Sequence, residues 1–133
     1  MIKMKEFSIK WKGSKKPGKQ RKFRINAPLH VRGRFLNVHL SKELGKQYNK
    51  RSIRIRKGDG VKILRGEFRN KTGKVERVDL NKGRVFVSDM VVSKKDGTKS
   101  YISIDPSNLM LVEIKTDDRK RRKTLEKKAG EQK

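Results

Sequence analysis

Residues 58–78 combine two short alternating segments with a turn-rich interval, and this pattern leaves few folds open to the chain. In the first segment Val61 and Ile63 are separated by one residue, a period of two that places both side chains on one face of a strand. After the interval, residues 73–78 supply a second extended segment in which Val75 faces inward. The pattern predicts two paired strands at the centre of a β-rich domain.

The interval between the two segments has the composition of a shaped loop. Gly66, Asn70 and Gly73 favour positive φ or a close approach of backbone, and Asn is the commonest non-glycine residue in the left-handed region. The same stretch is basic, and its side chains lie next to backbone N–H groups that such turns leave pointing outward. The loop residues that we expect to contact a polyanion are Arg65, Arg69, Asn70, Lys71 and Lys74.

This strand-loop-strand pattern resembles the KOW motif, which occurs in ribosomal proteins and in transcription elongation factors. The residues that carry the resemblance are Gly58, Asp59, Val61, Ile63, Gly66, Phe68, Gly73, Val75 and Val78. Gly58, Asp59, Gly66 and Gly73 are the expected backbone positions of the motif. The sequence departs from the pattern at Asn70, where many members carry glycine. The alternative interpretation is an ordinary β-hairpin with glycines in its loop.

Charge divides the 133-residue chain into three parts. The net charge is +25, and 40% of the residues are charged against 32% hydrophobic, which is too polar for the whole chain to fold around one core. Residues 1–57 hold 19 basic and 2 acidic residues, residues 58–114 hold 11 and 8, and residues 115–133 hold 9 and 4. Such an excess repels itself unless a polyanion neutralises it. We expect an N-terminal extension over residues 1–50, a barrel over 51–114 and a basic C-terminal helix or tail over 115–133.

The N-terminal extension contains the densest group of cations. Residues 13–24 hold six basic residues and no acid, and Gly13, Pro17 and Gly18 predict an irregular, extended arm. A solubilising tail or a nuclear-import signal is the alternative to contact with a polyanion. For residues 1–11 both a short docked strand and a disordered tail remain open. The residues expected to bind phosphates are Lys15, Lys16, Lys19, Arg21, Lys22 and Arg24.

Between this arm and the barrel we expect one extended segment and one short helix. Pro28 disfavours helix at Ala27, so residues 26–34 are expected to be extended, with His30, Arg32 and Arg34 available to a polyanion. Ser41 is a good N-cap and Asn49 a plausible C-terminal cap, which predicts a helix over about 41–48. Basic residues then alternate with Ile53 and Ile55, and the cations expected to face a polyanion are Arg51, Arg54, Arg56 and Lys57.

The second half of the chain predicts further short strands. Residues 84–87 form a third strand, and a fourth begins at Val91 and turns at Asp96-Gly97, a strong hairpin signal. The return strand covers 99–104, a tight turn covers 105–108, and the last strand covers 109–114. Five or six short strands suggest a small, strongly bent antiparallel barrel. Residues from about 118 to 129 predict a helix whose apolar face is too thin to pack strongly, so we expect it to form fully only against a partner.

No group of residues predicts catalysis or a metal site. The chain lacks cysteine, which excludes disulfides and thiolate zinc sites. His30 and His39 have neither metal-pair spacing nor acidic companions, and His39 is interpreted as incidental. The aspartates, Asp59 among them, fall at strand ends and turns, where Asp caps and turns chains. We expect no enzyme, cofactor or metal, no small-molecule substrate, and, without an apolar run of about 18 residues, no membrane span.

The flanks of the motif narrow the resemblance. Residues 15–22, 26–32, 40–44 and 106–110 are similar to the archaeal and eukaryotic-type family of large-subunit ribosomal protein L-twenty-four, over about residues 14–125. The resemblance implies an SH3-like barrel in a cytoplasmic ribosome. It implies a structural protein that binds the 5′ domain of the large ribosomal RNA early in assembly, near the peptide exit tunnel. The partners implied are this RNA and neighbouring ribosomal proteins, without a homo-oligomer.

Two other functions share some of these features. A KOW-type transcription elongation module that docks RNA polymerase usually has a separate α/β domain or further barrels, and this chain has basic arms instead. A nucleoid-compacting DNA protein would share the charge but would need no shaped loop. Because RNA duplexes are recognised through shape, phosphates and 2′-hydroxyls, basic arms beside a shaped loop favour RNA.

Overall fold

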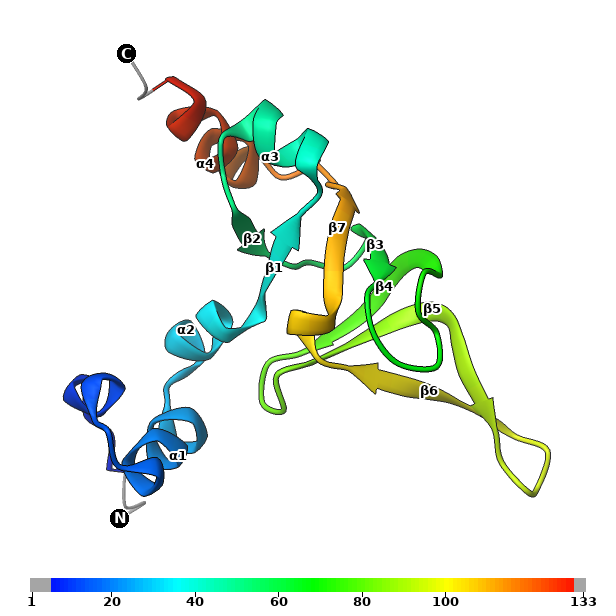
Figure 1. Cartoon of the computed structure of the whole chain (residues 1–133), viewed down its shortest axis with the longest axis horizontal. Coiled ribbons are helices and arrows are strands. Elements are labelled where there is room, and N and C mark those ends of the chain that lie inside the picture. Colours follow the sequence, from blue (N-terminus) through cyan, green and yellow to red (C-terminus); the bar gives the residue numbers. More distant parts are fainter. Residues whose placement is uncertain (1–5, 131–133) are drawn as a thin grey trace.

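A single bent sheet forms the centre of the molecule (Figure 1). The computed structural model describes residues 6–130. The strand order is β2-β1-β7-β3-β4-β5-β6, and all neighbouring pairs are antiparallel except β1 and β7, which are parallel. The strands are β1 (Asn37–Leu40), β2 (Ser52–Arg54), β3 (Gly60–Ile63), β4 (Thr72–Asp79), β5 (Arg84–Ser93), β6 (Lys99–Ile104) and β7 (Leu109–Glu113).

The predicted KOW hairpin is formed by β3 and β4. Val61 and Ile63 are each 1% exposed, and Val75 on β4 is also buried, so the alternating residues face the core as expected. The loop contains positive φ at Gly66 and at Asn70, which confirms that Asn70 takes the conformation of a glycine there. At Gly73 the requirement is space, because a Cβ would lie 2.8 Å from Cγ1 of Val87.

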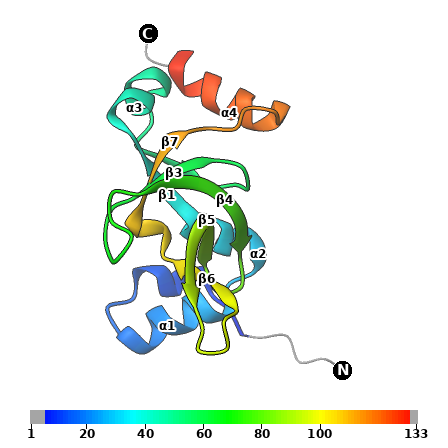
Figure 2. The ribbon, with the colours of Figure 1, turned by 90° about the vertical axis from the view of Figure 1, so that its right-hand side faces the viewer.

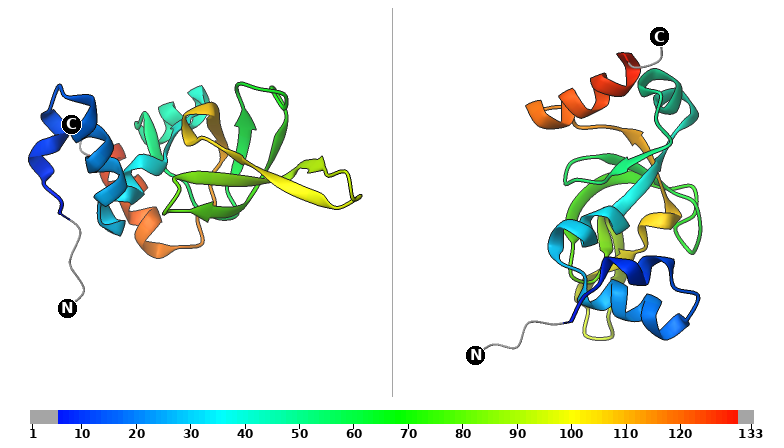
Figure 3. Two further views of the ribbon diagram at one scale, coloured as in Figure 1. Left: turned by 90° about the horizontal axis from the view of Figure 1, so that it is seen from below. Right: turned by 90° about the vertical axis from the view of Figure 1, so that its left-hand side faces the viewer.

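Strand β5 bends the sheet and differs from the expectation of two strands at residues 84–87 and from 91. It is one strand of ten residues, interrupted by Asp89 at φ 65°, and its register against β6 shifts between Phe86 and Val91. A bulge of this kind turns a strand without ending it. The hairpin of β5 and β6, which turns at Gly97 as predicted, projects at the opposite end of the long axis from the N-terminal helices (Figures 1 and 3).

The predicted fold class is confirmed, with one change in the sheet. The chain is mainly β, and its bent seven-stranded sheet is consistent with an SH3-like barrel. The change is β1, which the sequence analysis placed in the N-terminal extension. Val38 is fully buried and Leu40 is 9% exposed, and β1 joins β2 to β7. Four residues give too short an alternation to signal a strand, and a parallel partner so distant in sequence leaves no local trace.

The two helices on the C-terminal side of the sheet agree with the expected bounds. Helix α3 (Lys42–Tyr48) begins at the Ser41 cap, which accepts from the N–H of Leu44, and ends at Asn49 in the left-handed conformation. Helix α4 (Arg119–Gly130) lies beside α3 (Figure 2). The expectation that α4 forms only against a partner is wrong, because Leu125 is 1% exposed and Arg121 is buried against the chain itself.

The basic N-terminal segment is helical, which corrects the expectation of an extended arm. A 3-10 helix, η1 (Ile9–Gly13), precedes α1 (Pro17–Asn26). Pro17 occupies the first helical position, where its missing N–H has no partner to lose, and the lysines, arginines and glutamine that follow are good helix formers. Pro17 and Gly18, which the sequence analysis interpreted as helix breakers, lie at the start of this helix. Of residues 1–11, the first five lie outside the described residues, and residues 9–11 form no strand.

Residues 26–34 are also helical in their second half. Ala27 and Pro28 are extended as expected, but α2 (Leu29–Arg32) and a second 3-10 helix, η2 (Gly33–Leu36), follow at once. Ala27, before Pro28, is not helical, as expected, but Pro28 itself acts as the N-cap of α2, a helix that the sequence analysis did not predict. A third 3-10 helix, η3 (Pro106–Asn108), forms the predicted tight turn before β7.

The helical arm has its own small core. Phe23, Ala27 and Val31 are buried together, and Phe7 and Trp11 pack against them. The rings of Phe7 and Phe23 stack at 5.4 Å between centroids. This cluster holds η1, α1 and α2 as one unit at one side of the sheet (Figure 3).

Candidate nucleic-acid interface

Helix α1 and the residues just before it present a cationic face to solvent. Phe23 points into the arm's core, so the basic residues occupy the rest of the helix surface. Residues 15–24 contain six basic side chains, and none of them forms an ion pair with a carboxylate within residues 6–130. The arm cations, all exposed, are Lys15, Lys16, Lys19, Arg21, Lys22 and Arg24.

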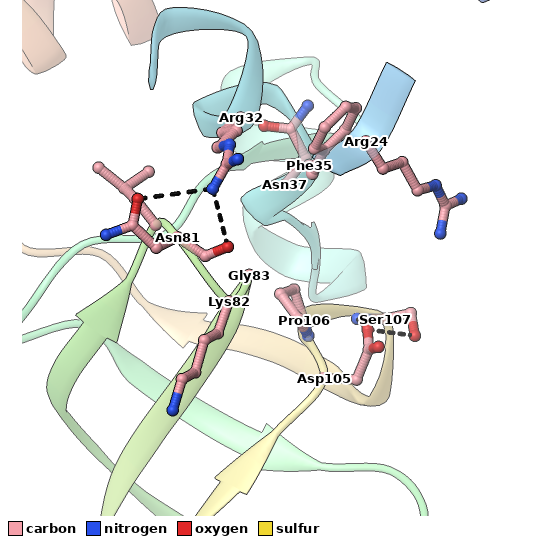
Figure 4. A pocket seen from close by; sticks show the side chains of 11 residues that line it. Arg24, Arg32, Phe35, Asn37, Asn81, Lys82, Gly83, Asp105, Pro106 and Ser107 are labelled. Atoms are coloured by element: carbon pink, nitrogen blue, oxygen red, sulfur yellow. Dashed lines mark hydrogen bonds between the residues drawn. The ribbon is translucent and has the colours of Figure 1, made fainter. Parts of the chain in front are cut away.

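Arg32 fixes this arm to the sheet. Its Nε donates to the carbonyl oxygen of Ala27 at 2.9 Å, Nη1 donates to the carbonyl oxygen of Asn81 at 3.0 Å, and Nη2 donates to the carbonyl oxygen of Ile25. Figure 4 shows this guanidinium reaching the Asn81 turn between β4 and β5. The sequence analysis expected Arg32 to face a polyanion, whereas protein carbonyls take up its donors here. The cations of α1 are therefore held in a fixed orientation relative to the sheet.

The other two residues of that expected group lie on the surface. His30 on α2 and Arg34 on η2 are both exposed. They belong to the connection between α1 and β1, and so extend the cationic surface of the arm toward the sheet. His39 is also exposed, on the solvent-facing side of β1.

The basic segment that leads into the barrel is divided between solvent and protein contacts. Arg51 and Lys57 are exposed. The guanidinium of Arg54 lies against Gly33, where an added Cβ would be 2.6 Å from Nη1. Arg56 forms an ion pair with Asp118, and the hydrogen bond from the Arg56 side chain, followed by that from the N–H of Lys120, lowers the pKa of the Asp118 carboxyl.

The KOW loop forms a third basic group. The N–H of Asn70 donates to the carbonyl oxygen of Ile63 at 2.8 Å, which closes the loop onto the end of β3. The ammonium of Lys71 lies 4.9 Å from the centre of the Phe68 ring, a cation–π contact that leaves it at the surface. The five residues named for this loop, Arg65, Arg69, Asn70, Lys71 and Lys74, are all exposed.

A buried ion pair links the start of the KOW hairpin to the C-terminal helix. Nη1 and Nη2 of Arg121 donate to the two carboxylate oxygens of Asp59, each at 2.6 Å, and both side chains are almost fully buried. Asp59 also accepts from the backbone N–H of Arg56 at 2.9 Å and of Lys115 at 3.0 Å. The sequence analysis had Asp59 as a backbone position of the KOW motif and as a turn residue, and it missed Arg121. No local signal joins two residues 62 positions apart.

The described residues form neither a metal-binding group nor a membrane-spanning helix. Among residues 6–130, no three histidine, aspartate or glutamate side chains gather in a way that could hold a metal ion. None of the helices in that part of the chain has the length and apolar character needed to cross a bilayer.

Comparisons with a family model and with individual known proteins point to the same group of proteins. A family model that describes ribosomal proteins L26 of eukaryotes and L24 of archaea matches residues 14–128. A protein of Methanosphaera stadtmanae named large ribosomal subunit protein uL24 is 50% identical over 115 residues, which cover 86% of this chain and 98% of that protein. A protein of the same name from Methanoculleus marisnigri is 46% identical over 112 residues, covering 84% and 93%.

Proposed function

The chain belongs to the family of eukaryotic L26 and archaeal L24 ribosomal proteins, and from this premise we propose that it binds large-subunit ribosomal RNA through its basic surfaces. Its role is that of a structural protein of the large subunit in cytoplasmic ribosomes, which agrees with the expectation that it is not an enzyme. The RNA is the 5′ domain of the large ribosomal RNA, bound early in assembly and near the peptide exit tunnel. Neighbouring ribosomal proteins complete its surroundings.

The observation that carries this proposal is the cationic face of α1. Four exposed basic side chains on α1 and two directly before it belong to an arm that is fixed to the sheet, and none of them forms an ion pair with the described acidic residues. Double-stranded RNA excludes side chains from its deep major groove and is therefore bound largely through phosphates and 2′-hydroxyls. A row of ammonium and guanidinium groups on an ordered backbone suits such a surface, because only the side chains, and not the backbone of the arm, lose conformational freedom on binding.

The KOW loop and the segment before β3 supply further contacts in this proposal. The loop contributes Arg65, Arg69, Asn70, Lys71 and Lys74, and the segment contributes Arg51 and Lys57. Arg54 and Arg56 contribute less in the present geometry, because one packs on Gly33 and the other pairs with Asp118. We also propose that the three parts divided by charge have separate roles. The basic extension over residues 1–50 and the basic tail over 115–133 bind RNA on either side of the barrel over 51–114.

The salt dependence of binding tests this function. For the purified protein and a transcript of the 5′ domain, the logarithm of the association constant is expected to fall linearly with the logarithm of salt concentration. Each neutralised phosphate contributes about −0.7 to −0.9 to the slope, so engagement of the six arm cations alone requires a slope of at least about −4. A slope near −1 or −2 would mean one or two contacts and would contradict the proposal.

A further inference from the structure

A cleft separates the helical arm from the sheet. It has a volume of about 450 Å³ and opens between α1, η2, β1, the β4–β5 turn and η3 (Figure 4). Arg32 closes one end through its hydrogen bonds to Asn81. The cleft exists only because the arm is folded and fixed beside the sheet, so it could not be expected from an extended arm. Its walls include Arg24, Phe35, Asn37, Asn81, Lys82, Asp105 and Pro106.

One wall carries an aromatic ring in a fixed position. Phe35 is 39% exposed, although it is a large apolar residue. Its ring meets that of Phe23 edge to face, with centroids 5.7 Å apart and planes at 70°, and Phe23 in turn stacks on Phe7. In Figure 4 the Phe35 ring lies on one side of the cleft and Pro106 on the other. A rigid, partly exposed ring of this kind is a platform on which a nucleobase stacks.

Apart from its three cations, Arg24, Arg32 and Lys82, the polar groups of the cleft wall suit a base better than a phosphate. The amide of Asn37 offers a donor and an acceptor, and that of Asn81 offers a donor while its Oδ1 accepts from Nη1 of Arg32 at 3.5 Å; amide groups of this kind read base edges. The Asp105 carboxyl keeps its charge, because the hydrogen bond from the N–H of Ser107 lowers its pKa, with smaller contributions from the Ser107 hydroxyl and from Arg84 and Arg24. A carboxylate in the wall repels a phosphate placed beside it.

The cations of the cleft complete this arrangement. Arg24 and Lys82 are exposed, and in Figure 4 both side chains extend away from the centre of the cleft. Because the two side chains extend on opposite sides of the view, the phosphates before and after a base held inside would each have one positive charge to meet. We propose that the cleft receives a single unpaired nucleotide of the bound RNA, with its base stacked on Phe35 and its edge at Asn37 and Asn81.

This inference rests on the proposed function and adds to it. The arm cations contact phosphates, which carry no sequence information, whereas a base in the cleft makes the protein recognise one looped-out or bulged position. The phosphate contacts therefore give affinity for RNA duplexes in general, and the cleft selects the position at which an unpaired nucleotide can enter it.

Substitution of Phe35 by leucine tests the stacking contact. Leucine keeps an apolar contact with Phe23 but removes the aromatic face, so the affinity for the 5′ domain transcript is expected to fall about 5- to 150-fold, the range for loss of one stacked base. The slope of binding against salt should stay unchanged, because no charge is lost. Tyr101→Leu is the matched control, since Tyr101 is an exposed aromatic residue on β6 and should leave the affinity unchanged.

A second variant tests the cleft without altering the aromatic cluster that holds the arm together. Asn37→Ala removes an exposed amide on β1 without touching the aromatic cluster, and it is expected to weaken binding about 2- to 13-fold, the effect of one lost hydrogen bond to a base edge. Ultraviolet cross-linking of the wild-type complex, read by mass spectrometry, should join the peptide that contains Phe35 to one nucleotide. Chemical probing should find that nucleotide unpaired in the free RNA.

The outcomes separate this inference from the proposed function. If the wild-type protein shows the steep salt slope while both variants bind as tightly as the wild type, the cleft holds no nucleotide and the phosphate contacts stand. A cross-link from the Phe35 peptide to another protein in intact large subunits would likewise overturn the inference in favour of a peptide ligand. A shallow slope for the wild type would instead remove the proposed function itself.

Discussion

Replacing Asp59 by alanine is expected to unfold the barrel or leave it only marginally stable. The change leaves the Arg121 guanidinium buried without its carboxylate, and removal of one partner from a buried ion pair costs about 3–5 kcal/mol. It also removes the acceptor for the backbone N–H groups of Arg56 and Lys115, each of which costs about 1–3 kcal/mol when left unsatisfied. Domains of this kind are stable by about 5–15 kcal/mol in total, so the loss is a large fraction.

Urea denaturation followed by circular dichroism measures this effect on the full chain. The matched control is Arg56→Gln, which breaks the exposed ion pair with Asp118 at the same end of the barrel and should change the free energy of unfolding by less than about 1 kcal/mol. Arg121→Met should be destabilising but less so than Asp59→Ala, since Asp59 then keeps its two backbone donors. Equal midpoints for Asp59→Ala and Arg56→Gln would show that the buried pair does not hold α4 to the barrel.

Neutralising the arm is expected to have the largest effect on RNA binding. A variant with all six arm cations changed to glutamine loses up to six phosphate contacts. Each contact multiplies the association constant by the molar salt concentration raised to the power of about −0.8. The affinity at 0.2 M salt should therefore fall on the order of 10³-fold. The slope against salt should become shallower by about 4 to 5, and circular dichroism should be retained because glutamine is also a good helix former.

A comparison at equal charge separates local contacts from general attraction. Lys16, Lys19 and Lys22 changed to glutamine should reduce the slope by about 2 to 3. The same three changes at Lys94, Lys95 and Lys99, which are exposed at the tip of the β5–β6 hairpin, alter the net charge equally and should leave the slope nearly unchanged. Equal effects of the two triple variants would mean that RNA responds only to total charge and that α1 has no special position.

The elements that sequence analysis predicted correctly are those whose signals are local. The β3–β4 hairpin follows from alternation within a few residues and from Gly66 and Asn70, which must adopt positive φ. The same holds for α3, where Ser41 and Asn49 mark both ends. In each case the residues that specify the element are also the residues that contact one another.

The features that were missed depend on contacts distant in sequence. Strand β1 gains its stability from β7, about seventy residues away, and the Asp59–Arg121 pair joins residues 62 positions apart. For the arm, the error came from treating Pro17 and Gly18 as breakers, although the burial of Phe23 with Trp11 and Val31 stabilises a helix there. The cleft beside Phe35 follows from that helix, so no pattern in the sequence indicated it.

Sedimentation with ribosomal particles tests the central claim most directly. A tagged form of this protein, expressed in cells and separated on a sucrose gradient at low salt, should travel with the large subunit and should leave it only when salt is raised far enough to strip its phosphate contacts. Recovery at the top of the gradient, or in the fractions that contain RNA polymerase, would contradict the account.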